Sequence, residues 1–116
     1  MEWYERFYAK EKWCKKSVEI EGSLYEKLKN ISANELDASV NKIIDACIDS
    51  LELPDKIIIY KKEKTEINIV RSIIIRESMY KKLETLREKY DISVYKLLNI
   101  AIREGLEKYY NSKTNI

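Results

Sequence analysis

The sequence predicts a mainly helical protein in which two strand-helix-helix units pair their strands into a two-stranded antiparallel ribbon on a four-helix core. Two observations lead to this fold class. Apolar residues occupy every second position of Lys16–Ile20, and they do so again in Arg71–Ile75. The residues behind each segment then follow a helical apolar pattern and match one another in order. The chain therefore contains an internal repeat.

The repeat can be followed residue by residue. The first unit has one more residue than the second between its two helices, and the alignment is otherwise continuous. The matched positions are Ser17, Ser23, Tyr25, Lys27 and Leu28 with Ser72, Ser78, Tyr80, Lys82 and Leu83, then Asp37, Ser39, Val40, Lys42 and Ile48 with Asp91, Ser93, Val94, Lys96 and Ile102.

These matches divide the chain into five segments. They are an aromatic N-terminal extension (1–14), the first unit (15–53), a connector (54–69), the second unit (70–110) and a polar tail (111–116). In the connector, Ile57–Tyr60 and Ile67–Val70 flank a polar, lysine-rich run. We expect a solvated loop, a hairpin with these two arms, or an arm that contacts phosphate.

Cap signals place the helices of the first unit. Ser23, with Glu26 three residues later, predicts a capping box before a helix over 24–34. Ser39 predicts the cap of a second amphipathic helix, which ends before Leu53-Pro54. The second unit repeats this order, and its closing helix is expected to reach about Tyr110.

Composition excludes several classes of function. The chain has no histidine, the commonest general base and metal ligand. Its two cysteines form no C-x-x-C pair, and Cys47 lies on an apolar helical stripe, which favours a reduced core residue over a disulfide with Cys14. We therefore expect no catalytic residue, no metal site, no cofactor, no small-molecule substrate and no enzyme activity.

Other features bear on location and source. Residues 1–13 lack the order of a signal peptide, and no apolar run is long enough to span a membrane. We expect a soluble protein of the cytoplasm, or of the host cytoplasm if the source is viral. Abundant Ile, Lys and Glu are also compatible with a thermophilic source.

The N-terminal extension carries four aromatic residues at helical spacing: Trp3, Tyr4, Phe7 and Tyr8. Three interpretations stand for this aromatic face. It caps the core, it forms a surface through which copies of the chain associate, or it contacts DNA.

One strand and two short helices leave backbone groups unpaired and a core open, so the two units must combine. Antiparallel pairing of the strands would bury an inner face of Val18, Ile20, Ile73 and Ile75 on the helices. The opposite face would point to solvent, as an ordinary solvated strand surface or as a binding surface.

The order of elements resembles the ribbon-helix-helix DNA-binding proteins of the Arc and Met repressor type, over about 15–53 and again 70–110. The marks of the resemblance are the alternating strands, the steps Ile20 to Leu24 and Ile75 to Met79, and the helix starts Ser39-Val40 and Ser93-Val94. In that family two chains form the ribbon, whereas here one chain carries both halves.

The resemblance implies a transcription regulator, such as a repressor, whose ribbon enters the major groove of duplex DNA. It places on base edges Lys15, Ser17, Glu19, Val70, Ser72, Ile74 and Arg76. It places on phosphates Lys16, Ser39, Val40, Asn41, Lys42, Arg71, Ser93, Val94, Tyr95 and Lys96.

Several positions depart from the family pattern. Glu19, Val70 and Ile74 differ between the halves, so the two halves cannot recognise the same half-site. Lys16 and Arg71 replace apolar residues, and we expect them to extend towards phosphate. Aspartate stands where glycine often makes the turn between the helices. The alternative function is a protein-interaction or antitoxin-like adaptor that uses the aromatic N-terminus.

Overall fold

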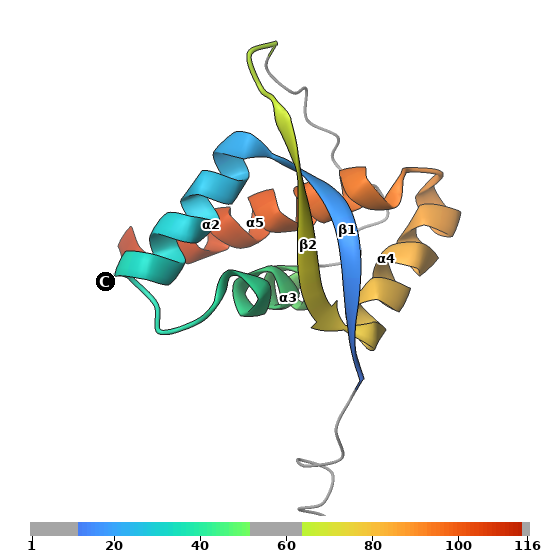
Figure 1. The fold of residues 1–116 in the computed structure, drawn as a ribbon, viewed down its shortest axis with the longest axis horizontal. Coiled ribbons are helices and arrows are strands. Elements are labelled where there is room, and N and C mark those ends of the chain that lie inside the picture. The colour runs from blue at the N-terminus through green and yellow to red at the C-terminus, as the bar shows by residue number, and fades with distance from the viewer. Residues whose placement is uncertain (1–11, 52–63, 115–116) are drawn as a thin grey trace, which may run out of the picture.

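The computed structural model describes residues 12–51 and 64–114. The elements in these ranges are β1 (Trp13–Glu21), α2 (Gly22–Asn34), α3 (Val40–Ser50), β2 (Asn68–Arg76), α4 (Glu77–Tyr90) and α5 (Val94–Thr114). Figure 1 shows the two strands crossing in front of the helices, with α2 and α4 on opposite sides of the ribbon. A mainly helical fold with a two-stranded antiparallel ribbon is therefore confirmed.

The two strands pair over their whole length. Ser17 stands opposite Ser72 at the centre, and the pairs at the two ends are Trp13 with Arg76 and Glu21 with Asn68. Backbone hydrogen bonds close both ends, from the N–H of Gly22 to the carbonyl of Ile67 at 2.9 Å and from the N–H of Glu77 to the carbonyl of Lys12 at 2.8 Å. Both strands are longer than the alternating segments predicted, because the pairing also takes in residues of the extension and the connector.

The connector hairpin stays a prediction, because the structure describes only one of its two arms. Residues 68–70 of Ile67–Val70 belong to β2 and pair with Glu19–Glu21 of β1. The proposed partner arm, Ile57–Tyr60, lies outside the described residues, as do residues 61–63 of the lysine-rich run 61–66.

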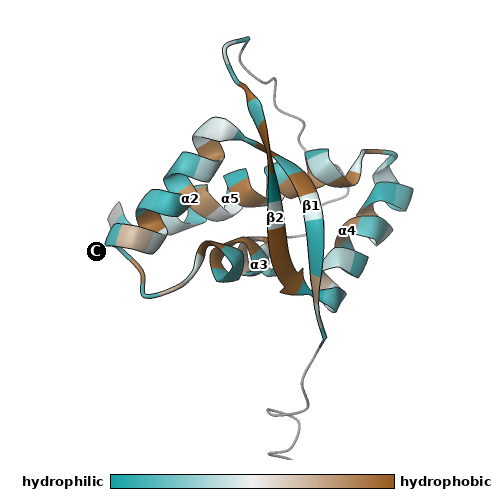
Figure 2. Ribbon diagram, viewed as in Figure 1, coloured by the Kyte–Doolittle hydropathy of each residue, from teal (hydrophilic) through white to brown (hydrophobic). Residues whose placement is uncertain are grey.

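The inner face of the ribbon forms one side of the core. Val18, Ile20, Ile73 and Ile75 are all buried, as the alternation predicts. The helices supply the rest of a single hydrophobic cluster, which includes Leu28, Ile44, Leu83 and Leu98 among its buried members. In Figure 2 the arrow end of β2 is brown while teal predominates on the adjacent part of β1, so the two strands differ in hydropathy.

The helix starts agree with the sequence in part. The Ser39 and Ser93 hydroxyls accept hydrogen bonds from the backbone N–H groups of Lys42 and Lys96, each at 3.2 Å, which confirms both caps. The Ser23 cap is wrong, because α2 begins at Gly22 directly after β1 and Ser23 lies in its first turn. The Ser23 hydroxyl and backbone N–H instead donate to the Glu66 carboxylate.

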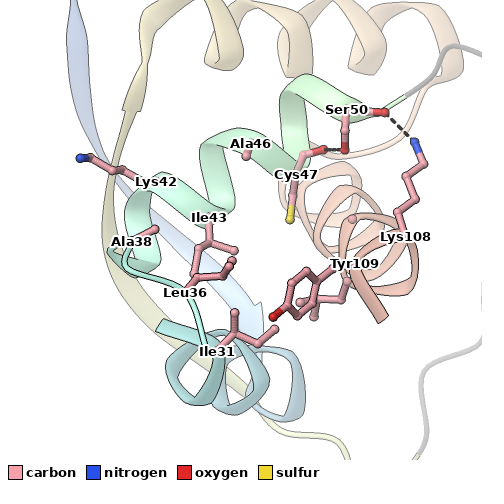
Figure 3. A pocket seen from close by; sticks show the side chains of 12 residues that line it. Ile31, Leu36, Ala38, Lys42, Ile43, Ala46, Cys47, Ser50, Lys108 and Tyr109 are labelled. Carbon is pink, nitrogen blue, oxygen red and sulfur yellow. Dashed lines mark hydrogen bonds between the residues drawn. The ribbon is translucent and has the colours of Figure 1, made fainter. Parts of the chain in front are cut away.

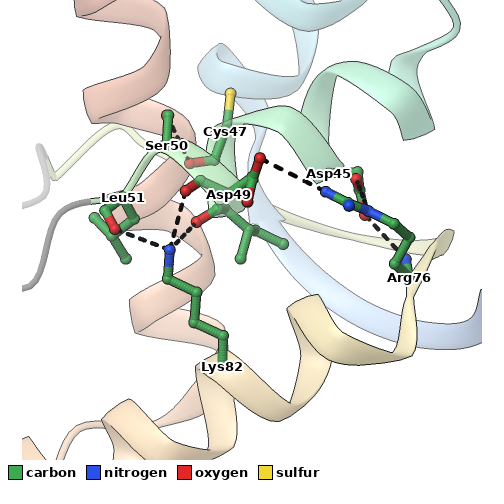
Figure 4. Close-up of polar contacts among 8 residues, drawn as sticks. Asp45, Cys47, Asp49, Ser50, Leu51, Arg76 and Lys82 are labelled. Atoms are coloured by element: carbon green, nitrogen blue, oxygen red, sulfur yellow. Dashed lines mark hydrogen bonds and ion pairs between the residues drawn. The ribbon is translucent and has the colours of Figure 1, made fainter. Parts of the chain in front are cut away.

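The inter-helix turn at Asp91 adopts the left-handed conformation, with φ of 54°. Aspartate tolerates this region better than most residues. The neighbouring helix α5 then runs to Thr114, beyond the predicted end at Tyr110. By contrast α3 stops at Ser50, and the Lys82 ammonium donates to the carbonyls of Ile48, Asp49 and Leu51 at 2.8–3.1 Å (Figure 4).

Helices α3 and α5 approach closely at Cys47 and Gly105. A Cβ at Gly105 would lie 2.4 Å from the Cys47 sulfur and 3.1 Å from its Cα, so only glycine fits there. Cys47 is buried and both cysteines are free, which confirms the reduced core residue. Burial raises the pKa of the Cys47 thiol to about 11.

Candidate nucleic-acid interface

Six side chains predicted to face outward do so. Lys15, Ser17 and Glu19 of β1 are exposed, as are Val70, Ser72 and Ile74 of β2. Val70 is 60% exposed and Ile74 is 42% exposed, so each presents apolar surface to solvent. We call these six side chains the outer row.

Strand pairing arranges the outer row in three cross-strand pairs. The Ser17–Ser72 pair lies at the centre, with Lys15–Ile74 on one side and Glu19–Val70 on the other. Directly opposed side chains on one face of an antiparallel pair are close neighbours. One side of the centre thus presents an ammonium beside an apolar group, and the other a carboxylate beside an apolar group.

Arg76 follows the outer row in sequence, but its guanidinium is directed to α3. Its Nε lies 2.8 Å from Oδ2 of Asp45, and its NH2 group lies 3.7 Å from a carboxylate oxygen of Asp49 (Figure 4). The Arg76 backbone N–H also donates to Oδ1 of Asp45 at 2.9 Å. A base contact by Arg76, which stays a prediction, would require it to leave a carboxylate that is only 6% exposed.

Trp13 was expected to belong to the N-terminal extension, but it forms the first residue of β1 at one end of the ribbon. It pairs with Arg76 and is 50% exposed, so it continues the outward-facing positions of β1. The alternation of outward residues at 15, 17 and 19 extends back to 13, and this signal could have located it.

The free edges of both strands are covered by side chains of the second helix of each unit. Asn41 on α3 accepts a hydrogen bond from the N–H of Ile74 at 3.2 Å. Asn99 on α5 accepts from the N–H of Glu21 at 2.9 Å and donates to the carbonyl of Glu19 at 3.0 Å. Helix α3, which follows β1 in sequence, therefore lies along β2, and α5 lies along β1.

Sequence reasoning missed these polar contacts. Asp45 and Asn99 are buried and align in the repeat, each within a stripe otherwise made of apolar residues. A buried polar side chain in such a stripe requires a hydrogen-bond partner, and strand edges need partners too. A polar residue at the same place in both apolar stripes, together with strand edges that need partners, could therefore have predicted these contacts.

The same contacts place the N-termini of α3 and α5 beside the ribbon. Asn41 lies in the first turn of α3, and Asn99 also donates to the carbonyl of Tyr95, in the first turn of α5, at 2.8 Å. The exposed side chains at these two ends include Lys42, Tyr95 and Lys96. Val40 and Val94 pack against the core, so only their backbone groups are available to a ligand. First-turn N–H groups lack intrahelical acceptors, and the helix dipole favours an anion there.

Lys16 and Arg71, expected to extend towards phosphate, contact tyrosine rings. The Lys16 ammonium lies 4.5 Å from the centre of the Tyr80 ring, and the Arg71 guanidinium lies 5.2 Å from that of Tyr25. Cation–π contacts at such partly exposed sites contribute only about 0.5–1 kcal/mol. Movement of either cation to a nearby phosphate would therefore cost little, and a phosphate contact by either stays a prediction.

Other expectations concern residues outside this interface. The aromatic face of Trp3, Tyr4, Phe7 and Tyr8 lies outside the described residues. Within 12–51 and 64–114, no cluster of three or more Cys, Asp or Glu residues has the arrangement of a metal site. In the same ranges no helix is long and apolar enough to cross a bilayer.

Comparison with known proteins does not assign the chain to a family. No protein-family model, no curated protein and no solved structure matches the chain.

Proposed function

We propose that this protein is a sequence-specific regulator of transcription that inserts its ribbon into the major groove of duplex DNA. The observation that carries the proposal is the outer row, six exposed side chains on a two-stranded ribbon with a helix N-terminus at each edge. A ribbon with strands about 5 Å apart fits a major groove about 12 Å wide. The arrangement resembles the ribbon-helix-helix family, with both units in one chain.

The chemistry of the outer row suggests what each pair would contact. The Lys15 ammonium can donate to the acceptors of guanine, and the Glu19 carboxylate can accept from the amino group of cytosine. Ile74 and Val70 can pack on thymine methyl groups, and the central serines can donate or accept. Because the pairs on the two sides of the centre differ, the DNA site under one chain is not a perfect palindrome.

The phosphate backbone would be held at both edges of the ribbon. The N-termini of α3 and α5 offer backbone N–H groups and the positive ends of their dipoles. Lys42 and Lys96 add one ammonium each, and Lys16 and Arg71 can leave their tyrosine rings to reach further phosphates. Affinity should therefore fall steeply as salt concentration rises.

The test compares two lysine variants of equal charge change. Lys96→Met should weaken duplex binding for all sequences alike and reduce the salt slope by about one. The control, Lys81→Met, lies on α4 with its ammonium 3.2 Å from Glu77 and should leave both unchanged. Fluorescence anisotropy with labelled duplexes measures both quantities. Equal effects of the two variants, or no preference for duplex over another polyanion at moderate salt, would exclude this mode of binding.

A further inference from the structure

An apolar groove lies between α2 and α3 of the first unit and α5 of the second. Its volume is about 430 Å³, and its lining includes Ile31, Leu36, Ala46, Cys47, Leu106 and Tyr109. Figure 3 shows Ile31, Cys47 and Tyr109 projecting towards the same space from three elements, while Lys42 is directed away from it. Its size is in the range of about 300–1,000 Å³ typical of binding sites.

The groove is open because the first unit has smaller side chains than the second. Ala38 and Ala46 line it, and the repeat aligns them with Ile92 and Ile100. Ile100 is 1% exposed, whereas Ala46 is exposed. The second unit thus fills with its own isoleucine the position that the first unit leaves uncovered.

Segment 1–11 is joined to the described chain at Lys12, which is held near α3, the helix that supplies one wall of this groove. The carbonyl of Lys12 accepts the Glu77 N–H at 2.8 Å, and the adjacent Arg76 contacts Asp45 and Asp49 of α3. Ala46, Cys47 and Ser50 of the same helix line the groove. A helix with its side chains is about 10–12 Å wide, and eleven extended residues span up to about 36 Å. The segment is therefore long enough to pass around α3.

We propose that the aromatic residues of segment 1–11 dock in this groove of the same chain and cover Ala46. Four of its eleven residues are aromatic, namely Trp3, Tyr4, Phe7 and Tyr8, and such side chains bury large apolar areas. The groove offers apolar partners on all three elements. This proposal does not depend on DNA binding.

Trp3 reports on docking directly. The chain has two tryptophans, so Trp13→Phe leaves Trp3 as the single emitter in the full-length protein. In this background we expect blue-shifted emission and protection from a soluble quencher. Ala46→Glu should shift the emission to the red and raise the quenching constant several-fold, because it places a charge in the apolar groove. Ala33→Glu, at an exposed alanine of α2 outside the groove lining, should change neither.

Protein concentration separates docking within the chain from docking between chains. Protection that is independent of concentration, in a monomer by sedimentation equilibrium, supports the proposal. Protection that appears only as concentration rises would overturn it in favour of exchange between copies. A freely quenched Trp3 in the parent, or protection that survives Ala46→Glu with unchanged circular dichroism, would also overturn it.

Discussion

Replacement of Asp45 by alanine should destabilise the fold by about 3 kcal/mol. The Asp45 carboxylate accepts the backbone N–H of Arg76 at 2.9 Å and its Nε at 2.8 Å, and so links the end of β2 to α3. Loss of one partner of a buried ion pair typically costs about 3–5 kcal/mol. The Arg76 side chain is 29% exposed and retains Asp49 at 3.7 Å, which places the cost at the lower end.

Asp45→Asn is the matched control for this prediction. An asparagine oxygen can still accept the Arg76 N–H, as Asn99 accepts the Glu21 N–H at the aligned position. We expect this variant to lose about half as much stability as the alanine variant, since one charge-assisted hydrogen bond contributes about 1.5–3 kcal/mol. Urea denaturation followed by circular dichroism measures both. An alanine variant within about 0.5 kcal/mol of the parent, or equal losses for the two variants, would refute the reasoning.

Three further predictions concern the helices behind the ribbon. Gly105→Ala should lower stability by about 1–3 kcal/mol, measured as a lower melting temperature, because the new methyl overlaps Cys47. Burial raises the pKa of the Cys47 thiol from 9.0 to about 11, so its neutral form contributes stability below pH 9 that is lost as pH rises through 11. Denaturation curves should show an alkaline loss of up to about 3 kcal/mol that Cys47→Ala removes. Lys82→Met should cost about 1–3 kcal/mol in urea denaturation, because three carbonyls at the end of α3 lose their donor. Unchanged stability in Gly105→Ala or in Lys82→Met would count against the packing described. An alkaline loss of stability that persists in Cys47→Ala would do the same.

The strands and the inner core were predictable because period-two alternation depends on local sequence alone. Val18 and Ile20, with Ile73 and Ile75, identify the face of each strand that is buried, because a slip of one residue would turn them to solvent. The caps at Ser39 and Ser93 were predictable for the same reason, since a cap needs only its own first turn.

The failures share a different cause, which is dependence on distant residues. Ser23 has the sequence of a cap, but β1 leads directly into α2 and Glu66 supplies the serine with a partner from 43 residues away. The contact of the Arg76 guanidinium with Asp45 and Asp49 of α3 was likewise not visible in the alternation of β2, and the predicted base contact of Arg76 stays untested. Residues 68–70 of the arm at Ile67–Val70 pair with Glu19–Glu21 of β1, far away in the chain. Local pattern cannot anticipate such contacts.

Selection of bound sequences from a random duplex pool tests the central claim most directly. The ribbon with a Ser17–Ser72 centre and unequal pairs on either side predicts a single enriched motif that is not a perfect palindrome within the stretch contacted by one chain. The double variant Ser17→Ala with Ser72→Ala should change the preferred bases at the centre of that motif and leave its flanks intact. Ser112→Ala, which changes an exposed residue of α5, is the control: selection with this variant should enrich the same motif as selection with the parent protein. No enriched motif, a motif that is a perfect palindrome within the stretch contacted by one chain, or a centre unaffected by the double variant would contradict the assignment of the outer row to base contacts.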